Sequence, residues 1–251
     1  MPWRICLCWL VGLGWVASVP AQAAEISVAV AANFAAPLAK LGEAFTAATG
    51  HTLRLSTGAT GKFYSQIVAG APFEVLLSAD AETPAKLVGQ GLAVRGSAFT
   101  YAVGRLVLWS PQPGFVDEQG AVLVSGRFEH LAIANPKLAP YGLAAVAVLK
   151  AKGLEAALAP KLVTGESLAQ AYQFVASGNA ELGFVALSQV AAPGQSLVGS
   201  LWHVPQALFP PIRQDAVLLL PGKGNPAAAE LLAYLKSAPA RAVIEAWGYG
   251  Q

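Results

Sequence analysis

The decisive stretch of this sequence is STGATGKFYSQI, residues 56–67. It follows a strand-like run at residues 52–55, and its apolar Phe63 and Ile67 recur at helical spacing. A strand, a loop of glycines and hydroxyl residues and then a helix start leave several backbone N–H groups without intrahelical partners. Such an end attracts anions, and the threonine hydroxyls add uncharged donors. The stretch therefore predicts either an anion-binding turn or an ordinary helix cap formed by Thr60.

The spacing of the glycines argues against a nucleotide-binding P-loop. That motif needs four residues between its glycines and a hydroxyl residue after its lysine. Here only two residues separate Gly58 from Gly61, and Phe63 follows Lys62. Nucleotide hydrolysis is not expected.

The first residues, 1–23, have the pattern of a secretory signal peptide. Arg4 precedes an apolar run at residues 5–19, which is shorter than a membrane-spanning helix needs, and Ala21-Gln22-Ala23 forms a small-x-small cleavage site. The mature chain is expected to begin at Ala24 and to act in the periplasm.

The predicted mature chain has a nearly balanced charge and no cysteine. Cys6 and Cys8 both fall in the signal, so disulfides, thiolate catalysis and cysteine-bound metals are excluded. Without Arg4, 15 basic residues face 14 acidic ones. This balance argues against binding to nucleic acid or to an acidic membrane surface.

The rest of the chain alternates predicted strands and helices, which indicates an α/β fold. Strands are expected at residues 26–31, 52–56, 74–77, 105–109, 131–134, 182–186 and 216–220. A helix is expected after each of the first three strands. Two more are expected at residues 142–151 and 168–178, and the last two start at Pro226 and Pro239. Thr83 and Ser167 are the expected N-caps.

This order predicts two α/β lobes with a ligand cleft between them. One lobe is expected to comprise residues 24–103 with 216–251, and the other residues 104–215. Residues 101–104 and 214–216 are the predicted hinges. Four loops before helix starts, around residues 31–33, 57–61, 139–141 and 165–168, are expected to converge on the ligand.

Motifs for enzyme chemistry are weak. The three histidines lack metal-binding spacing, so no metal cation is expected. Ser167 and Ser188 lie outside any Gly-x-Ser-x-Gly elbow. Asp80, at a strand end, is expected to bind loop amides next to Thr83. No catalytic residue and no cofactor are predicted.

Taken together, short motifs across the mature chain resemble the periplasmic molybdate-binding proteins of ABC transporters, the ModA type. The motifs are VAANF at 30–34, GATGK at 58–62, QI at 66–67, GAP at 70–72, LSAD at 77–80, NP at 135–136, APYG at 139–142 and LGFV at 182–185. The resemblance implies a two-lobed periplasmic-binding-protein fold (type II). It also implies molybdate or tungstate as ligand, an ABC permease as partner and a monomer without enzyme activity.

The resemblance also implies a ligand-binding set of Ala32, Asn33, Thr60, Tyr141 and Leu168. Ala32, Tyr141 and Leu168 would contribute backbone N–H groups, Asn33 its N–H and side chain, and Thr60 its hydroxyl. Some relatives use a tyrosine directly after the strand that here ends with Phe184-Val185, where this chain has Ala186. Since alanine has no donor, the hydroxyl of Tyr141 is expected to replace it.

A site of N–H and O–H donors suits a fully ionised tetrahedral oxyanion, because such an anion has only acceptor oxygens. Phosphate keeps a proton near neutral pH and is therefore disfavoured. The alternatives are a binding protein for sulfate or another small oxyanion, a secreted hydrolase, and a chaperone-like or sensor domain. The missing His-acid pairing argues against the hydrolase, and the missing effector domain argues against the sensor.

Overall fold

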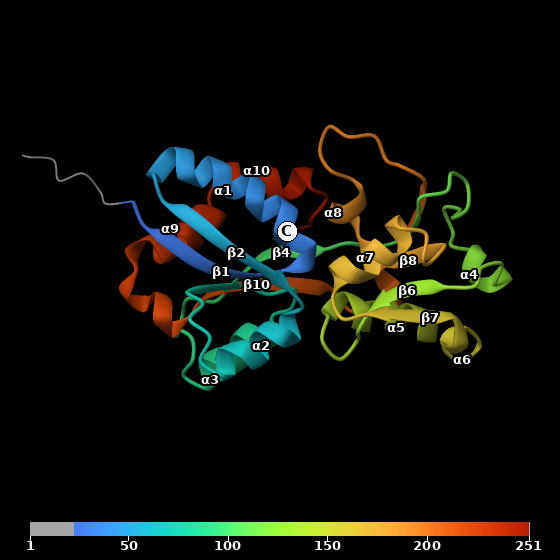
Figure 1. Ribbon diagram of the computed structural model, residues 1–251, viewed down its shortest axis with the longest axis horizontal. Coiled ribbons are helices and arrows are strands. Elements are labelled where there is room, and N and C mark those ends of the chain that lie inside the picture. Colours follow the sequence, from blue (N-terminus) through green and yellow to red (C-terminus); the bar gives the residue numbers. More distant parts are fainter. Residues whose placement is uncertain (1–22, 251) are drawn as a thin grey trace, which may run out of the picture.

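The computed structural model describes residues 23–250. The predicted signal peptide lies outside the described residues, except for its last position. Two five-stranded sheets form two lobes side by side along the long axis of the molecule (Figure 1). The predicted two-lobed α/β fold is thereby confirmed.

The first lobe is built on a mixed sheet with the strand order β2-β1-β3-β10-β4. Its strands are β1 (Glu25–Ala31), β2 (Thr52–Gly58), β3 (Val75–Leu77), β4 (Phe99–Gly104) and β10 (Ile212–Leu218). Its helices are η1 (Ala32–Phe34), α1 (Ala35–Thr49), α2 (Thr60–Val68), α3 (Glu82–Gly89), η4 (Leu220–Gly224), α9 (Pro226–Leu235) and α10 (Ala238–Ala246).

Both faces of the first sheet are covered, as the apolar strands predict. Val28 and Val30 pack with α1, α9 and α10 on one face, whereas Ala29 packs with α2 and α3 on the other. Successive side chains of β1 alternate between the two clusters because strand side chains have a period of two.

The second lobe has the strand order β7-β6-β8-β5-β9. Its strands are β5 (Leu106–Ser110), β6 (Leu131–Ala134), β7 (Leu162–Gly165), β8 (Leu182–Ala186) and β9 (Ser200–His203). Its helices are α4 (Val122–Ser125), α5 (Pro140–Ala151), α6 (Glu155–Leu158), η2 (Ala159–Lys161), α7 (Leu168–Ala176), α8 (Leu187–Val190) and η3 (Gln206–Leu208). Among the described helices, none combines the length and apolar character that a membrane crossing requires.

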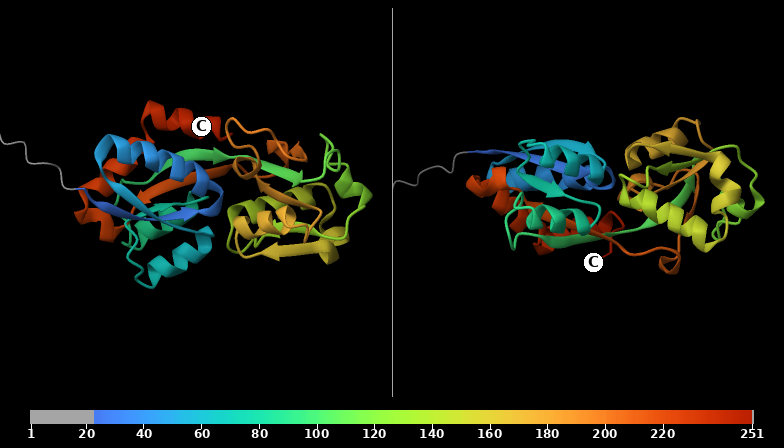
Figure 2. Two further views of the ribbon diagram at one scale, coloured as in Figure 1. Left: turned by 45° about the horizontal axis from the view of Figure 1, so that its top comes forward. Right: turned by 90° about the horizontal axis from the view of Figure 1, so that it is seen from below.

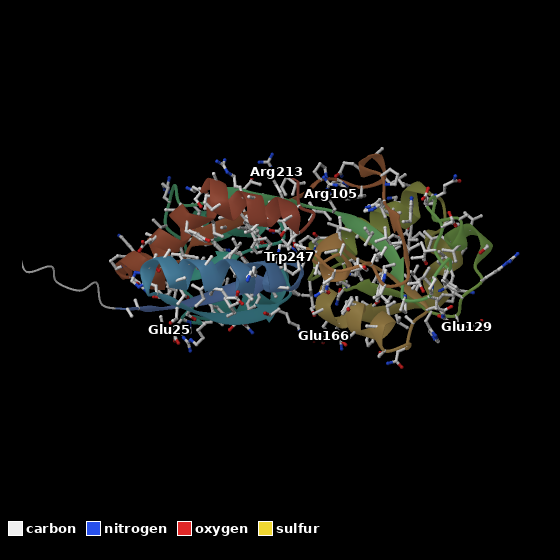
Figure 3. The ribbon with its side chains drawn as sticks, turned by 90° about the horizontal axis from the view of Figure 1, so that it is seen from above. Glu25, Arg105, Glu129, Glu166, Arg213 and Trp247 are labelled. Carbon is white, nitrogen blue, oxygen red and sulfur yellow. The ribbon has the colours of Figure 1, made fainter. Side chains whose placement is uncertain are left out.

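Between these strands, the chain passes from one lobe to the other at two places. Only Arg105 separates β4 from β5, and residues 204–211 lead from β9 back to β10. Figures 2 and 3 show both segments crossing the same side of the molecule, with Arg105 at the passage. β10 pairs with β4 from Ile212 and Gly104 onward, so residues 212–215 lie in the first sheet. The predicted strand began only at residue 216, because Arg213 to Asp215 interrupt the apolar pattern.

Of the two predicted N-caps, the structure confirms Ser167 and not Thr83. Ser167 caps α7, since its Oγ accepts from the N–H of Gln170 at 3.3 Å, as predicted. Thr83 does not cap α3, because the helix already begins at Glu82. Asp80 Oδ1 accepts from the N–H of Thr83 at 2.8 Å, which confirms the loop-binding role expected for Asp80.

Candidate anion-binding site

One small cavity lies between the lobes and brings distant loops together. It is lined by residues 31–33, 58–60, 79, 139–141 and 168 and has a volume of about 10 Å³. All five residues of the predicted ligand-binding set line it: Ala32, Asn33, Thr60, Tyr141 and Leu168.

Strand register explains why these loops meet. β1 and β2 run parallel and end level, with Ala31 opposite Gly58, while β6 and β7 end level with Ala134 opposite Gly165. Parallel strands that end together place the following helix starts at one sheet edge. In each lobe, two helical segments therefore begin beside the cavity: η1, which continues into α1, with α2, and α5 with α7.

The Thr60 side chain does not cap α2, in contrast to the ordinary-cap alternative. Ala59 occupies the N-cap position, and Thr60 Oγ1 instead accepts from the backbone N–H of Ala79 at 3.0 Å. Thr60 is 2% exposed. A hydroxyl that accepts in this way keeps its own proton for another acceptor. Thr60 can therefore donate to a ligand in the cavity.

The Asn33 side chain belongs to a buried network that the sequence did not predict. Its Nδ2 donates to Gln214 Oε1 at 2.8 Å and to Tyr249 Oη at 3.1 Å. Its backbone oxygen accepts from Tyr249 Oη at 2.7 Å and from Ser188 Oγ at 2.9 Å. Both N–H bonds of the amide are thus engaged by protein groups, which leaves the backbone N–H groups at the start of η1 as the donors that this loop can offer to a ligand.

The Tyr141 hydroxyl lies where the two lobes meet. Its Oη accepts from Gln214 Nε2 at 3.2 Å, so its proton also remains available. Gly104 is required here, because a β-carbon at this position would collide with Tyr141 Oη and lie 2.7 Å from Gln214 Nε2. Ala186, at the end of β8, is buried and has no side-chain donor.

The donors at the site are neutral. Burial raises the pKa values of Tyr141 and Tyr101 well above the ordinary phenol value, and it raises that of Tyr249 as well. These hydroxyls therefore keep their protons across the physiological range. Among residues 23–250, no charged side chain lines the cavity. The site can satisfy an anion by hydrogen bonds and helix N-termini alone.

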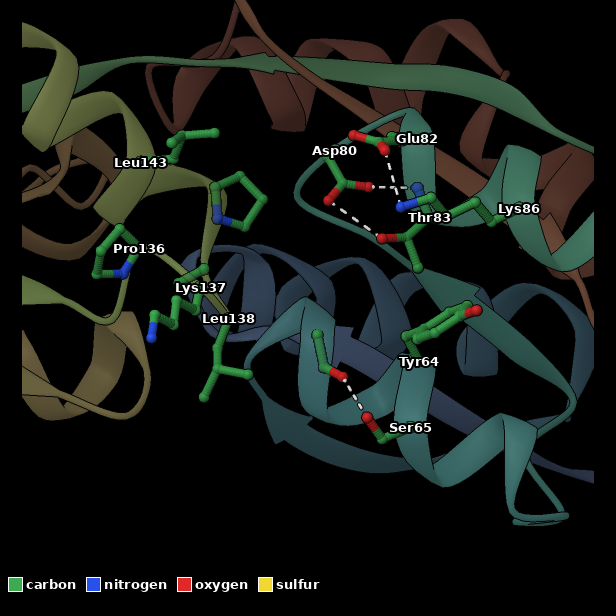
Figure 4. A pocket seen from close by; sticks show the side chains of 13 residues that line it. Tyr64, Ser65, Asp80, Glu82, Thr83, Lys86, Pro136, Lys137, Leu138 and Leu143 are labelled. Atoms are coloured by element: carbon green, nitrogen blue, oxygen red, sulfur yellow. Dashed lines mark hydrogen bonds and ion pairs between the residues drawn. The ribbon is translucent and has the colours of Figure 1, made fainter.

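Charged groups occur at the rim. Lys62 of α2 forms an ion pair with Glu166, which lies on the face of the second lobe turned toward the first (Figure 3). A wider hollow opens beside the cavity, between α2 and α3 on one side and the loop at residues 136–140 on the other (Figure 4). Asp80 and Glu82 line that outer hollow, where they bind Thr83 and Lys86.

The two candidate nucleophiles have structural partners. Ser167 caps α7, and Ser188 Oγ bonds to the backbone oxygen of Asn33 and lies 2.9 Å from Tyr249 Oη. Within the described part of the chain, no three His, Cys, Asp or Glu side chains gather where a metal cation could bind.

Two α/β lobes that enclose a neutral, donor-lined cavity define the class of two-lobed binding proteins. The family model described as bacterial extracellular solute-binding protein matches residues 26–250. The chain belongs to this family.

Relatives with a known ligand are similar over nearly the whole chain. The molybdate-binding protein ModA of Azotobacter vinelandii is 61% identical over 230 residues, which cover 92% of this chain and 91% of the relative. ModA of Rhodobacter capsulatus is 53% identical over 92% of this chain and 90% of its own. A solved periplasmic molybdate-binding protein of Azotobacter vinelandii superposes with a TM-score of 0.89 at 43% identity, covering 90% of this chain and 99% of the other.

Proposed function

We propose that the protein is an extracytoplasmic solute-binding protein that captures molybdate, and also tungstate, and delivers it to the permease of an ABC importer. The observation that carries the proposal is the uncharged cavity between the lobes. Helix starts from both lobes meet there, and the hydroxyl protons of Thr60 and Tyr141 are not used by the protein contacts described above. The ModA relatives support molybdate as the ligand.

The proposed ligand contacts come from Ala32, Asn33, Thr60, Tyr141 and Leu168. Thr60 and Tyr141 contribute hydroxyl groups, and the others contribute backbone N–H groups at helix starts. The side chain of Asn33 supports the site through Gln214 and Tyr249. A fully ionised oxyanion finds only donors in this set, whereas a protonated anion would bring a hydrogen that has no acceptor.

The protein acts in the periplasm as a monomer, without enzyme activity or a cofactor. Residues 1–23 are a signal peptide that is removed before Ala24. The periplasmic description of the solved relative supports this location. Mass spectrometry of the exported protein should give a chain that starts at Ala24, and retention of Cys6 and Cys8 would contradict the proposed cleavage.

The direct test is titration calorimetry with molybdate, tungstate and sulfate, followed by competition between them. We expect molybdate and tungstate to bind and to displace each other, while sulfate fails to displace them. Sulfate presents the same acceptors, so its rejection would reflect cavity size. Tight sulfate binding that excludes molybdate would instead establish a sulfate-binding protein.

A further inference from the structure

Gln214 is the buried centre of the network between the lobes. It is 0% exposed and lies on β10, one of the strands next to the passage. The pairing of β10 with β4 shifts between Gln214 and Asp215, so that Tyr101 of β4 has no partner in the ladder. Such a bulge redirects side chains. Here Gln214 reaches Asn33 and Tyr101 with its oxygen and Tyr141 with its nitrogen.

The direction of the hydrogen bonds follows from one backbone carbonyl. The oxygen of Asn33 can only accept, so Tyr249 Oη, 2.7 Å away, must donate its single proton to it. Tyr249 Oη can then only accept from the Asn33 side chain, which lies 3.1 Å away. The atom that Asn33 presents there is consequently its amide nitrogen.

The donor and acceptor atoms of Gln214 can be assigned in the same way. The Asn33 nitrogen donates across 2.8 Å, so the facing atom of Gln214 must be its oxygen. The Tyr101 hydroxyl lies 3.0 Å from that oxygen and 3.0 Å from the carbonyl oxygen of Ser78, so its one proton serves two acceptors. The Gln214 nitrogen is left facing Tyr141 Oη at 3.2 Å. An amide nitrogen only donates, so the phenol oxygen of Tyr141 accepts and its proton points elsewhere.

We propose that Gln214 is a positioning residue that turns the hydroxyl proton of Tyr141 toward the anion in the cavity. This inference rests on the proposed function and extends it. The network makes Tyr141 a donor before the ligand arrives, so the ligand need not reorient it. A fixed donor selects for a fully deprotonated oxyanion, because an anion oxygen that carries a proton would meet a second proton.

The first test is a double-mutant cycle on molybdate affinity, measured by titration calorimetry on the full mature protein. Gln214→Met keeps the length of the side chain without its hydrogen bonds, and Tyr141→Phe removes the hydroxyl. Each should weaken binding about tenfold or more, the effect of losing one hydrogen bond to a charged group. The double variant should be no weaker than the weaker single variant, because the two residues act as one unit. Independent, additive effects, or unchanged affinity of Gln214→Met, would overturn the role of Gln214.

A second variant covers the case in which Gln214→Met folds poorly. Gln214→Glu keeps an acceptor for Asn33 and Tyr101, but its carboxylate would accept a hydrogen bond from the Tyr141 hydroxyl, turn that hydroxyl away from the cavity and repel the anion. Protonation of the glutamic acid restores a donor, so affinity should recover as the pH falls from 8.5 to 6, since burial raises the pKa of a carboxyl group.

The surrounding phenols keep their protons in that range. The phenols of Tyr101, Tyr141 and Tyr249 have raised pKa values, and Asp80 and Asp215 are the carboxylates that act on Tyr101. The exposed Gln195→Glu is the matched charge control and should bind as the wild type does at each pH. A pH-independent loss in Gln214→Glu would contradict the proposal. Failure of the wild type to bind molybdate would instead refute the proposed function itself.

Discussion

The backbone N–H of Gly61 donates to the carbonyl oxygen of Leu138 at 2.9 Å and thereby joins the two lobes at the rim of the cavity. The backbones can approach so closely because residue 61 has no side chain. A β-carbon there would lie 3.1 Å from Leu138 Cα and 3.2 Å from its oxygen. The lobes are thus in contact beside the site, with the Lys62 and Glu166 ion pair next to this bond.

Gly61→Ala should weaken molybdate binding while leaving the fold unchanged. The added methyl group would hold the lobes a few tenths of an ångström apart, which disturbs contacts that need both lobes. Alanine has a higher helix propensity than glycine, and residue 61 lies in α2. The thermal stability of the ligand-free protein should therefore not fall. Calorimetric affinity and a thermal melt are the measurements. Gly89→Ala, where a β-carbon meets open space in α3, is the matched control and should bind normally. Normal affinity of Gly61→Ala would show that close contact at Leu138 is not needed.

Ligand binding should favour the closed arrangement of the lobes, because a ligand that contacts both lobes binds that state preferentially. The predicted hinge at residues 101–104 adjoins the passage at Arg105, whereas residues 214–216 lie within β10, just beyond the segment at residues 204–211. Small-angle scattering should therefore show a smaller radius of gyration with saturating molybdate. An unchanged radius would indicate a preformed cleft.

Loss of the neutral donors should matter more than loss of the rim cation. Thr60→Val removes the hydroxyl at nearly constant shape and Asn33→Ala removes the support of the first loop, so each should raise the dissociation constant roughly ten- to a hundredfold. Backbone N–H groups survive, so binding should be reduced and not abolished. Thr60→Ser keeps the hydroxyl and is the control.

Lys62→Ala should have a much smaller effect, since an exposed ion pair contributes only about 0.2 to 1 kcal/mol. Calorimetry gives the affinities and circular dichroism the folding state. If Lys62→Ala abolished binding while Thr60→Val did not, a charge-paired anion site would have to replace the neutral one.

Gly104→Ala should weaken binding by displacing the Tyr141 hydroxyl. The β-carbon would collide with Tyr141 Oη and lie 2.7 Å from the Gln214 amide nitrogen, so one of the two side chains must move. The effect should be smaller but not absent in a Tyr141→Phe background, because the hydroxyl is gone while the ring Cζ at 2.8 Å and Gln214 Nε2 would still crowd the β-carbon. An equal loss in both backgrounds would place the cause in the backbone of β4.

Stability should fall at high pH because of the buried phenols. Tyr101, Tyr141 and Tyr249 have raised pKa values in the folded state, so the folded protein binds more protons than the unfolded chain above pH about 10. The free energy of unfolding should be constant below that pH with respect to these groups and decrease above it. Chemical denaturation at pH 8 to 11 measures this, and Tyr249→Phe should show a shallower decrease than the wild type. An equal slope in the variant would exclude Tyr249 as a contributor.

Sequence patterns alone were sufficient for seven of the ten described strands, the two lobes and the loops that meet at the cavity, whereas β4, β7 and β9 were not predicted. These features follow from local chemistry: apolar runs form buried strands, and Ser, Thr, Gly and Pro mark helix starts. Ala32 and Thr60 could be placed at helix starts because each directly follows a strand within one βα unit. Their ligand roles, like that of Tyr141, came from the resemblance to a family.

Only the tertiary structure decided which side chains support the site. Gln214 and Tyr249 lie 181 and 216 residues from Asn33, and no spacing rule relates them. The local signals were a glutamine between the charged residues Arg213 and Asp215, and a tyrosine between two glycines. Likewise, Thr60 Oγ1 binds Ala79 because the antiparallel and parallel pairing around β3 brings that amide to the cavity. The sequence thus determined which groups can donate, whereas packing of the two lobes decided the direction in which their protons point.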